Sequence, residues 1–189
     1  GSRPVEIPSI PCNGTNIITS KEALEFKEIP KSMVIIGGGV IGCEFACMYS
    51  TMGTKVTIIE ALTRLIPMED EWVGRMLSRE FKKLGIESLN NQKVVSAEPM
   101  DGLVKVTLQD GQTILAEKVL VGVGRKAICD KETIENLGLV MNGSVIAVNK
   151  KMETSVKGVY AIGDAVGTTY LAHGGFAEAE TAADNATGH

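Results

Sequence analysis

Three glycines, Gly37, Gly39 and Gly42, have the spacing Gly-x-Gly-x-x-Gly and are the residues whose arrangement best suits chemistry. The first permits a tight turn, the second lets the backbone approach a pyrophosphate, and the third allows a helix to pack closely on a strand. Together with Val40 and Ile41 they would begin a helix, whose free N–H groups and dipole attract an anion. In a chain with 21 glycines the spacing alone is a weak signal, so the neighbouring elements must decide its meaning.

Those neighbouring elements indicate a βαβ unit that binds a dinucleotide. Met33–Ile36 is a continuous apolar run before the glycines, which is typical of a buried parallel strand. Apolar residues at helical spacing follow as far as Met52, and residues 55–60 form a second β-branched run that ends at Glu60. A carboxylate about 20 residues after the glycines is where this unit requires an acceptor for ribose hydroxyls.

Glu60 also predicts which nicotinamide cofactor binds. A carboxylate accepts hydrogen bonds from both ribose hydroxyls, but it repels a 2′-phosphate. Arg64 is the nearest cation that follows it, and an isolated loop arginine is more often solvated than used as a phosphate clamp. The sequence therefore favours NAD(H) over NADP(H).

Two acidic residues are left with open roles by their spacing alone. Glu44 lies in the first turn of the predicted helix, where it either complements the helix dipole or reaches the nicotinamide end of a cofactor. Asp164 follows Gly163 after the apolar run 159–162, where it either accepts hydrogen bonds from ligand hydroxyls or simply forms a turn.

Cysteine and histidine supply no catalytic residue that the sequence can assign. Cys43 and Cys47 are one helical turn apart, a poor geometry for a disulfide, so we expect two buried small residues rather than a redox pair. The two histidines, His173 and the terminal His189, complete no nucleophile–histidine set. The cysteine spacing also predicts no metal site.

The remaining pattern predicts an α/β, Rossmann-like FAD/NAD(P)-binding fold: a parallel sheet with helices and a three-stranded antiparallel meander in a crossover. We expect three parts: a connector with a short helix (1–30), an NAD-binding domain (31–150), and a returning flavin-domain segment (151–189). The expected elements beyond the βαβ unit are helices at 21–27, 70–84 and 171–187, meander strands at 93–98, 103–109 and 112–116, a buried strand at 118–122, and strands at 144–148 and 159–162.

Composition excludes several classes of protein. The 189 residues are 44% hydrophobic and 22% charged, which rules out disorder. A net charge of −4 without basic runs argues against nucleic-acid or anionic-membrane partners, and no apolar stretch is long enough to span a bilayer. We expect a soluble protein of a reducing, cytoplasmic compartment.

In order along the chain, the motifs resemble the flavin-dependent pyridine nucleotide–disulfide oxidoreductases, most of all the dihydrolipoyl dehydrogenase branch. The resemblance covers nearly the whole chain and is carried by Gly1–Pro4, residues 33–44, Glu60 with Arg64 and Pro67, residues 122–125, residues 161–165, and residues 171–173 with Glu178.

The resemblance implies roles for further residues and partners. Glu44 would lie near the nicotinamide and Gly124 beside the NAD. FAD, bound only by the full-length parent, would contact Gly163, Asp164, and the helix start at residues Leu171, Ala172 and His173. The parent would be a homodimer with flavin and dimerisation domains, and would oxidise the dihydrolipoyl group of a lipoyl-bearing protein with NAD+.

Departures from the family pattern limit what this chain does alone. Gly174, Gly175 and Ala179 replace the usual residues of the helix start, as Ala127 and Ile128 do after Arg125. The Cys-x4-Cys redox pair and the His-Glu base are absent, so we expect a piece truncated at both ends and inactive by itself. The alternatives are a non-catalytic NAD(H)-binding sensor or assembly module, and another disulfide reductase of the family.

Overall fold

The computed structural model describes residues 1–188, so His189 lies outside the described residues. The contacts divide the chain into two compact units. One runs from Pro4 to Gly124, and the other combines Gly1–Arg3 with the chain from Arg125 onward. The expected division at residues 30 and 150 separates NAD-binding from flavin-side parts by the cofactor that each would bind, and it stays a prediction.

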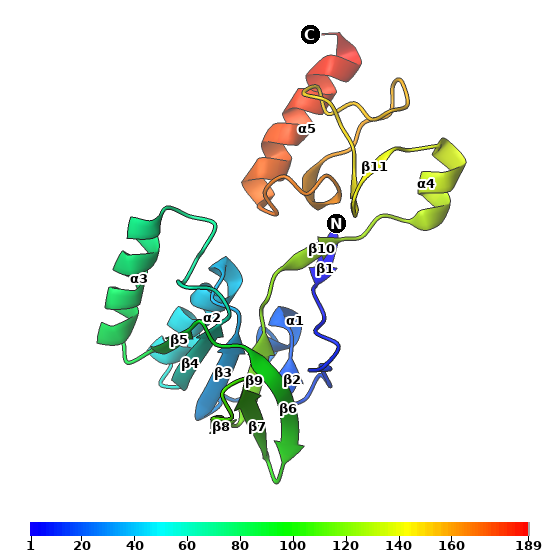
Figure 1. Cartoon of the computed structure of the whole chain (residues 1–189). Helices are drawn as coiled ribbons and strands as arrows, with labels where there is room; N and C mark the ends of the chain where they lie inside the picture. Colours follow the sequence, from blue (N-terminus) through cyan, green and yellow to red (C-terminus); the bar gives the residue numbers. More distant parts are fainter. Residues whose placement is uncertain (189) are drawn as a thin grey trace. The chain divides into compact units, whose positions relative to one another are not determined.

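A five-stranded parallel sheet forms the centre of the Pro4–Gly124 unit, as Figure 1 shows. The strand order is β2-β9-β3-β4-β5, and every pairing is parallel. The predicted α/β class and parallel sheet are confirmed. The strands are β2 (Ile17–Ile18), β3 (Ser32–Ile36), β4 (Lys55–Glu60), β5 (Glu87–Asn90) and β9 (Lys118–Val121).

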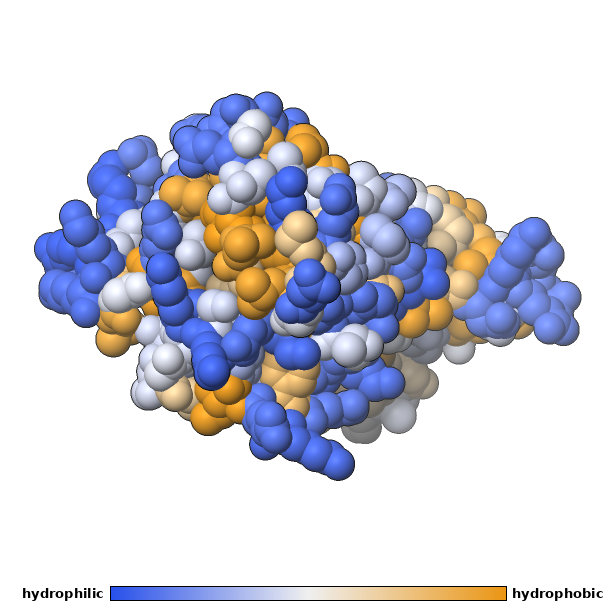
Figure 2. All heavy atoms as spheres, turned by 90° about the horizontal axis from the view of Figure 1, so that it is seen from below, coloured by the Kyte–Doolittle hydropathy of each residue, from blue (hydrophilic) through white to orange (hydrophobic). Residues whose placement is uncertain are grey.

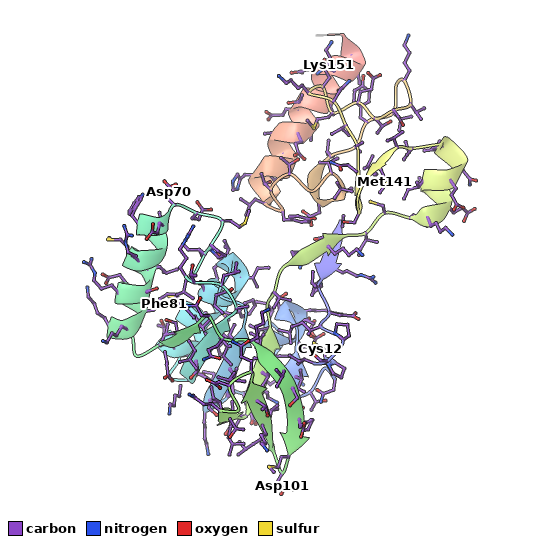
Figure 3. All side chains as sticks on the ribbon, viewed as in Figure 1. Cys12, Asp70, Phe81, Asp101, Met141 and Lys151 are labelled. Atoms are coloured by element: carbon purple, nitrogen blue, oxygen red, sulfur yellow. The ribbon has the colours of Figure 1, made fainter. Side chains whose placement is uncertain are left out.

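Two helices follow the first two central strands: α2 (Val40–Thr51) after β3 and α3 (Glu71–Lys83) after β4. The α2 side of the sheet holds one apolar core cluster, which includes Ile35, Ile58 and Phe45 from α2. Phe81, labelled on α3 in Figure 3, is buried in the same cluster.

The helix predicted at 70–84 is present as α3, and its apolar stripe is only partly buried. Trp72 is 57% exposed and Met76 45% exposed, whereas Phe81 is 4% exposed. The apolar stripe of α3 is therefore wider than the part of the helix surface that packs against the sheet.

The predicted antiparallel meander is confirmed, with the order β6-β7-β8. Its strands are β6 (Val94–Met100), β7 (Leu103–Leu108) and β8 (Thr113–Ala116). Asp101, at the hairpin tip in Figure 3, has φ +43° and precedes Gly102 at φ +81°, as an Asp-Gly turn requires. Alternate residues of the meander join Val34, Ile36 and Ile59 in a second core cluster on the other face of the sheet.

The helix predicted at 21–27 is a shorter α1 (Ser20–Ala23), and its N-cap is Thr19. The Thr19 side chain accepts a hydrogen bond from the Lys21 N–H, while Glu22 accepts from the Thr19 N–H at 2.9 Å and from its hydroxyl at 2.6 Å. These hydrogen bonds lower the pKa of Glu22. The reciprocal capping explains why the helix begins where it does.

The second unit contains the short strands and helices that follow Gly124. The predicted helix near the C-terminus is confirmed as α5, and α4 was not predicted. The elements are β1 (Ser2–Pro4) paired with β10 (Arg125–Ala127), α4 (Lys131–Leu137), β11 (Met141–Asn142) paired with β12 (Val145–Ile146), the 3-10 turn η1 (Gly163–Ala165), and α5 (Ala172–Thr187).

The strand predicted at 159–162 is wrong. Among the described residues this segment makes only a single bridge, between Tyr160 and Glu153, and Ile162 is 39% exposed. An apolar run becomes a sheet strand only where a neighbouring strand pairs with it, and the described residues provide none here.

Apolar side chains reach the surface of both units. No residue of α5 is buried, and Phe176 on this helix is 72% exposed. Figure 2 shows one face of the molecule, on which apolar side chains gather between charged ones. No helix within residues 1–188 is long and apolar enough to cross a membrane.

Candidate dinucleotide-binding site

The glycine turn after β3 is held by contacts that exclude any side chain at two of its positions. Gly37 has φ +108°, and a Cβ on it would lie 2.6 Å from the Gly122 carbonyl oxygen at the end of β9. A Cβ on Gly42 would overlap the carbonyl oxygen of Gly37. The structure thus brings the ends of β3 and β9 and the start of α2 into direct backbone contact.

Gly39, the middle glycine of the motif, faces open space instead. It is the N-cap of α2 with an ordinary φ of −74°, and no heavy atom lies within 4 Å of the position of a Cβ. The Cys43 N–H donates to the Gly39 carbonyl at 2.9 Å, so the N–H groups of the three residues between them have no partner within the helix. An open approach to unpartnered helix N–H groups fits a pyrophosphate.

Glu60 ends β4 beside this turn and is only 7% exposed. One carboxylate oxygen accepts a hydrogen bond from the Gly38 N–H at 2.6 Å, and the other accepts from the Leu62 N–H at 2.7 Å. Each oxygen keeps a further lone pair for a ligand hydroxyl. The sequence placed Glu60 at this edge correctly but missed Gly38, whose only signal was its place among three consecutive glycines.

The loop after β4 supports the other side of the turn. Leu65 is fully buried where a Gly38 side chain would stand, and the Ile66 N–H donates to the Gly38 carbonyl at 2.7 Å. Arg64 donates to the carbonyl oxygens of Pro67 at 3.0 Å and Glu69 at 3.1 Å. Arg64 therefore shapes this loop and is not the solvated side chain that we expected.

The other predicted NAD contacts lie in the same unit, and none of them is a buried residue. Val40 is 49% exposed, Ile41 is half-buried and Glu44 is exposed. Gly124 is exposed at φ +115°, with open space where a Cβ would stand. Their assignments to the cofactor stay predictions.

The two α2 cysteines differ in a way the sequence did not indicate. Cys43 is buried, its thiol donates to the Gly38 carbonyl at 3.3 Å, and burial, reinforced by Glu60, raises its pKa to about 12. Cys47 is exposed, which corrects the expectation that both are buried. The cysteines are free thiols. Within residues 1–188 no group of three His, Cys, Asp or Glu side chains is arranged to hold a metal ion.

In the second unit, Asp164 belongs to a hydrogen-bonded set with Ser2 and Arg125. The Ser2 hydroxyl donates to Asp164, and it accepts from Arg125 Nε at 2.6 Å. Arg125 also donates to the Ser2 carbonyl at 2.8 Å. Sequence reasoning missed the part played by Ser2, for which the only signal was its place in the Gly1–Pro4 segment.

The turn that carries Asp164 is anchored on α5. Gly163 has φ +67°, and its N–H donates to a Glu178 carboxylate oxygen at 2.6 Å. A Cβ on Gly174 would overlap the Thr169 hydroxyl. Glycine replaces the usual bulkier residue of the family at this position, and the preceding loop packs closely against it. The predicted FAD contacts Leu171, Ala172 and His173 are exposed at the start of this helix, and their roles stay predictions.

The glycine turn, the carboxylate after the second central strand and the parallel sheet define a dinucleotide-binding α/β protein. A family model described as pyridine nucleotide-disulphide oxidoreductase matches residues 1–186, and the chain belongs to this family. The resemblance inferred from the motifs is thereby confirmed.

Relatives and solved structures agree with this assignment. The chain is 40% identical over 190 residues to a dihydrolipoyl dehydrogenase of Bacillus subtilis, and 37% identical over 193 residues to that of Geobacillus stearothermophilus. In both comparisons the match covers all of this chain and 41% of the relative.

Two solved structures share the fold. LpdA of Mycobacterium tuberculosis superposes with a TM-score of 0.93 at 26% identity, over 100% of this chain and 41% of that one. The HOCl-induced flavoprotein disulfide reductase RclA of Escherichia coli, as a Cu(II) complex, gives a TM-score of 0.90 at 26% identity, over 98% of this chain and 43% of that one. The chain thus spans about 41% of the length of the curated relatives named here.

Proposed function

We propose that this chain is the NAD(H)-binding part of a flavin-dependent disulfide oxidoreductase that acts as a dihydrolipoyl dehydrogenase. The reaction would oxidise a dihydrolipoyl group to the disulfide and reduce NAD+ to NADH. The match to dihydrolipoyl dehydrogenases at about 40% identity over the whole chain supports this choice of substrate.

The observation that carries the proposal is the hydrogen bond of 2.6 Å between the Gly38 N–H and the Glu60 carboxylate. It joins the glycine turn, which fits the pyrophosphate, to the side chain that would accept the ribose hydroxyls. A buried carboxylate in this place repels a 2′-phosphate, which supports NAD(H) as the cofactor.

In this proposal the residues of the chain bind and orient the cofactor. The open backbone at Gly39 and the start of α2 would hold the pyrophosphate, and Glu60 would hold the adenosine ribose. Glu44 and Gly124 would lie toward the nicotinamide, while Asp164 and the start of α5 would serve a flavin. The nicotinamide and the flavin supply the hydride chemistry when they are bound.

A second candidate is an oxidoreductase acting on a different disulfide. The likeness to the flavoprotein disulfide reductase RclA favours it, because that structure matches this chain about as well as LpdA does. Turnover of dihydrolipoamide by a full-length protein carrying this sequence separates the two candidates.

Calorimetric titration of the chain with NADH and then NADPH tests the cofactor proposal. We expect NADH to bind and NADPH to bind at least about tenfold more weakly, because a like charge near 4 Å is unfavourable even in a solvated site. Equal affinity for the two cofactors, or binding of neither, would contradict the proposal.

Gly39→Ala is the matching variant, because its methyl group would enter open space in the free protein and the path of the pyrophosphate in the complex. We expect NADH binding to be lost, while the free energy of unfolding changes by about 1 kcal/mol or less. Gly175→Ala is the control: it adds the same methyl group in ordinary contact with Gly163, within α5 of the other unit. Unimpaired binding by Gly39→Ala would contradict the placement of the pyrophosphate.

A further inference from the structure

Asn90 is the last residue of β5 and lies beside Glu60. The two strands are parallel, and Glu60 pairs with Asn90 in their register. Paired residues of neighbouring strands point to the same face of a sheet and are about 4.8 Å apart. Figure 1 shows β4 and β5 next to each other at one side of the sheet. The Asn90 side chain is therefore the next polar group along the sheet edge after the carboxylate.

The Asn90 amide oxygen is buried without a hydrogen-bond partner. Two other buried groups in this region also have an unpartnered atom, Arg64 Nε and Gln92 Oε1. Each of those groups is anchored through another nitrogen, Arg64 on loop carbonyls and Gln92 on Asp110 at 3.0 Å. The side chain of Asn90 makes no hydrogen bond to any described residue, so nothing in the fold itself uses its amide.

Backbone hydrogen bonds fix Asn90 relative to the predicted ribose site. The Gln92 N–H donates to the Glu60 carbonyl at 3.0 Å, and the Asn91 N–H donates to the Leu62 carbonyl at 2.9 Å. The turn after β5 is thereby tied to the end of β4. An unpartnered polar group held this firmly is a costly arrangement for folding, which favours a role in binding.

We propose that Asn90 is a specificity-determining residue that accepts a hydrogen bond from the adenosine half of the nicotinamide dinucleotide. The inference rests on the proposed function. A dinucleotide lies along the carboxyl ends of the strands, so a pyrophosphate at β3 and a ribose at β4 direct the rest of the adenosine over β5. The donor is either a ribose hydroxyl or the adenine 6-amino group.

The test compares Asn90→Leu with the wild-type chain, using Ser88→Ala as the control on the same face of β5. Loss of one neutral hydrogen bond predicts NADH binding about 3- to 10-fold weaker in Asn90→Leu, with Ser88→Ala unchanged. Leucine has a similar size and removes the unpartnered oxygen, so we expect the Tm of the free variant to equal or exceed that of the wild type. If Asn90 had a merely structural role, Asn90→Leu would lower the Tm and leave the affinity for NADH unchanged.

Reduced nicotinamide hypoxanthine dinucleotide, which lacks the 6-amino group, identifies the donor. If the amino group is the donor, the wild-type chain binds this analogue more weakly than NADH and Asn90→Leu does not distinguish them. If a ribose hydroxyl is the donor, Asn90→Leu weakens the binding of NADH and of the analogue by the same factor. Either pattern supports the assignment of Asn90.

The inference is overturned if Asn90→Leu binds NADH with wild-type affinity while the wild-type chain binds NADH as proposed. Absence of NADH binding by the wild-type chain would overturn the proposed function, and the role of Asn90 with it. The wild-type titration therefore separates the two failures.

Discussion

No residue with a side chain fits at position 42, because its Cβ would overlap the Gly37 carbonyl oxygen. We predict that Gly42→Ala lowers the free energy of unfolding by about 3 kcal/mol or more, since both overlapping groups are backbone or attached to it. Gly122→Ala is the control, because its methyl group would make only ordinary contacts at 3.7 Å. Urea denaturation measures both variants, and equal stability of the two would contradict the packing described.

The two α2 cysteines allow a second prediction at the scale of single residues. Burial raises the pKa of Cys43 to about 12, so its thiol stays protonated at neutral pH and is a poor nucleophile. We expect a thiol-specific reagent at pH 7.5 to modify Cys47 quickly and Cys43 only after unfolding. Mass spectrometry of peptides from briefly treated, folded protein would show this, and Cys47→Ser is the control. Equal modification of both residues would contradict the burial of Cys43.

At the scale of elements, the capping of α1 predicts a pH dependence. The Thr19 hydrogen bonds lower the pKa of Glu22 below its ordinary value of 4.5, so the ionised form stabilises the fold. This stabilisation is complete above pH 4.5 and is lost as the pH falls through the lowered pKa. We predict that Glu22→Ala costs about 1 kcal/mol or less at pH 7 and that the difference from the wild type shrinks below pH 4.5.

Thermal unfolding from pH 7 to pH 3 would measure this effect. Glu25→Ala is the control, because Glu25 is exposed just after α1 and takes no part in the cap. A difference between Glu22→Ala and the wild type that grows as the pH falls would refute the assignment.

Elements whose burial and pairing follow from local pattern could be predicted from the sequence. The apolar run of β3, the spacing of α2 and the two Asp-Gly turns of the meander each carry their own signal. The strand β5 does not, because Leu89 is its only apolar residue and its place at the sheet edge comes from pairing with β4. The run 159–162 fails in the opposite way, since its pattern indicates burial but no described strand pairs with it.

The residues of the candidate site likewise differ in whether a local sequence pattern identifies them. Glu60 was predictable because a dinucleotide fold requires an acceptor at the end of its second strand. The hydrogen bonds of Gly38 and Ser2 and the pairing of Asn90 with Glu60 join segments far apart in the chain, which residue spacing does not reveal.

At the scale of the whole molecule, the proposed NAD-binding residues Gly39, Glu60 and Asn90 all belong to the Pro4–Gly124 unit. This unit has its own sheet and both core clusters, which are the requirements for independent folding. We predict that residues 4–124 expressed alone unfold cooperatively and bind NADH within about threefold of the affinity of the 189-residue chain. Circular dichroism and calorimetry test this, with Gly39→Ala in the same piece as the control. An unfolded piece, or one that does not bind although the longer chain does, would contradict the prediction.

The two ends of the Pro4–Gly124 unit lie next to each other, since the Val5 N–H donates to the Gly124 carbonyl at 3.0 Å. In the sequence, this unit is inserted between Arg3 and Arg125 of the other unit. A gene segment encoding such a unit can be acquired, replaced or passed to another host protein without breaking the surrounding fold. Recombination at these two positions is thus a physically permitted route by which one reductase could exchange its nucleotide preference for that of another.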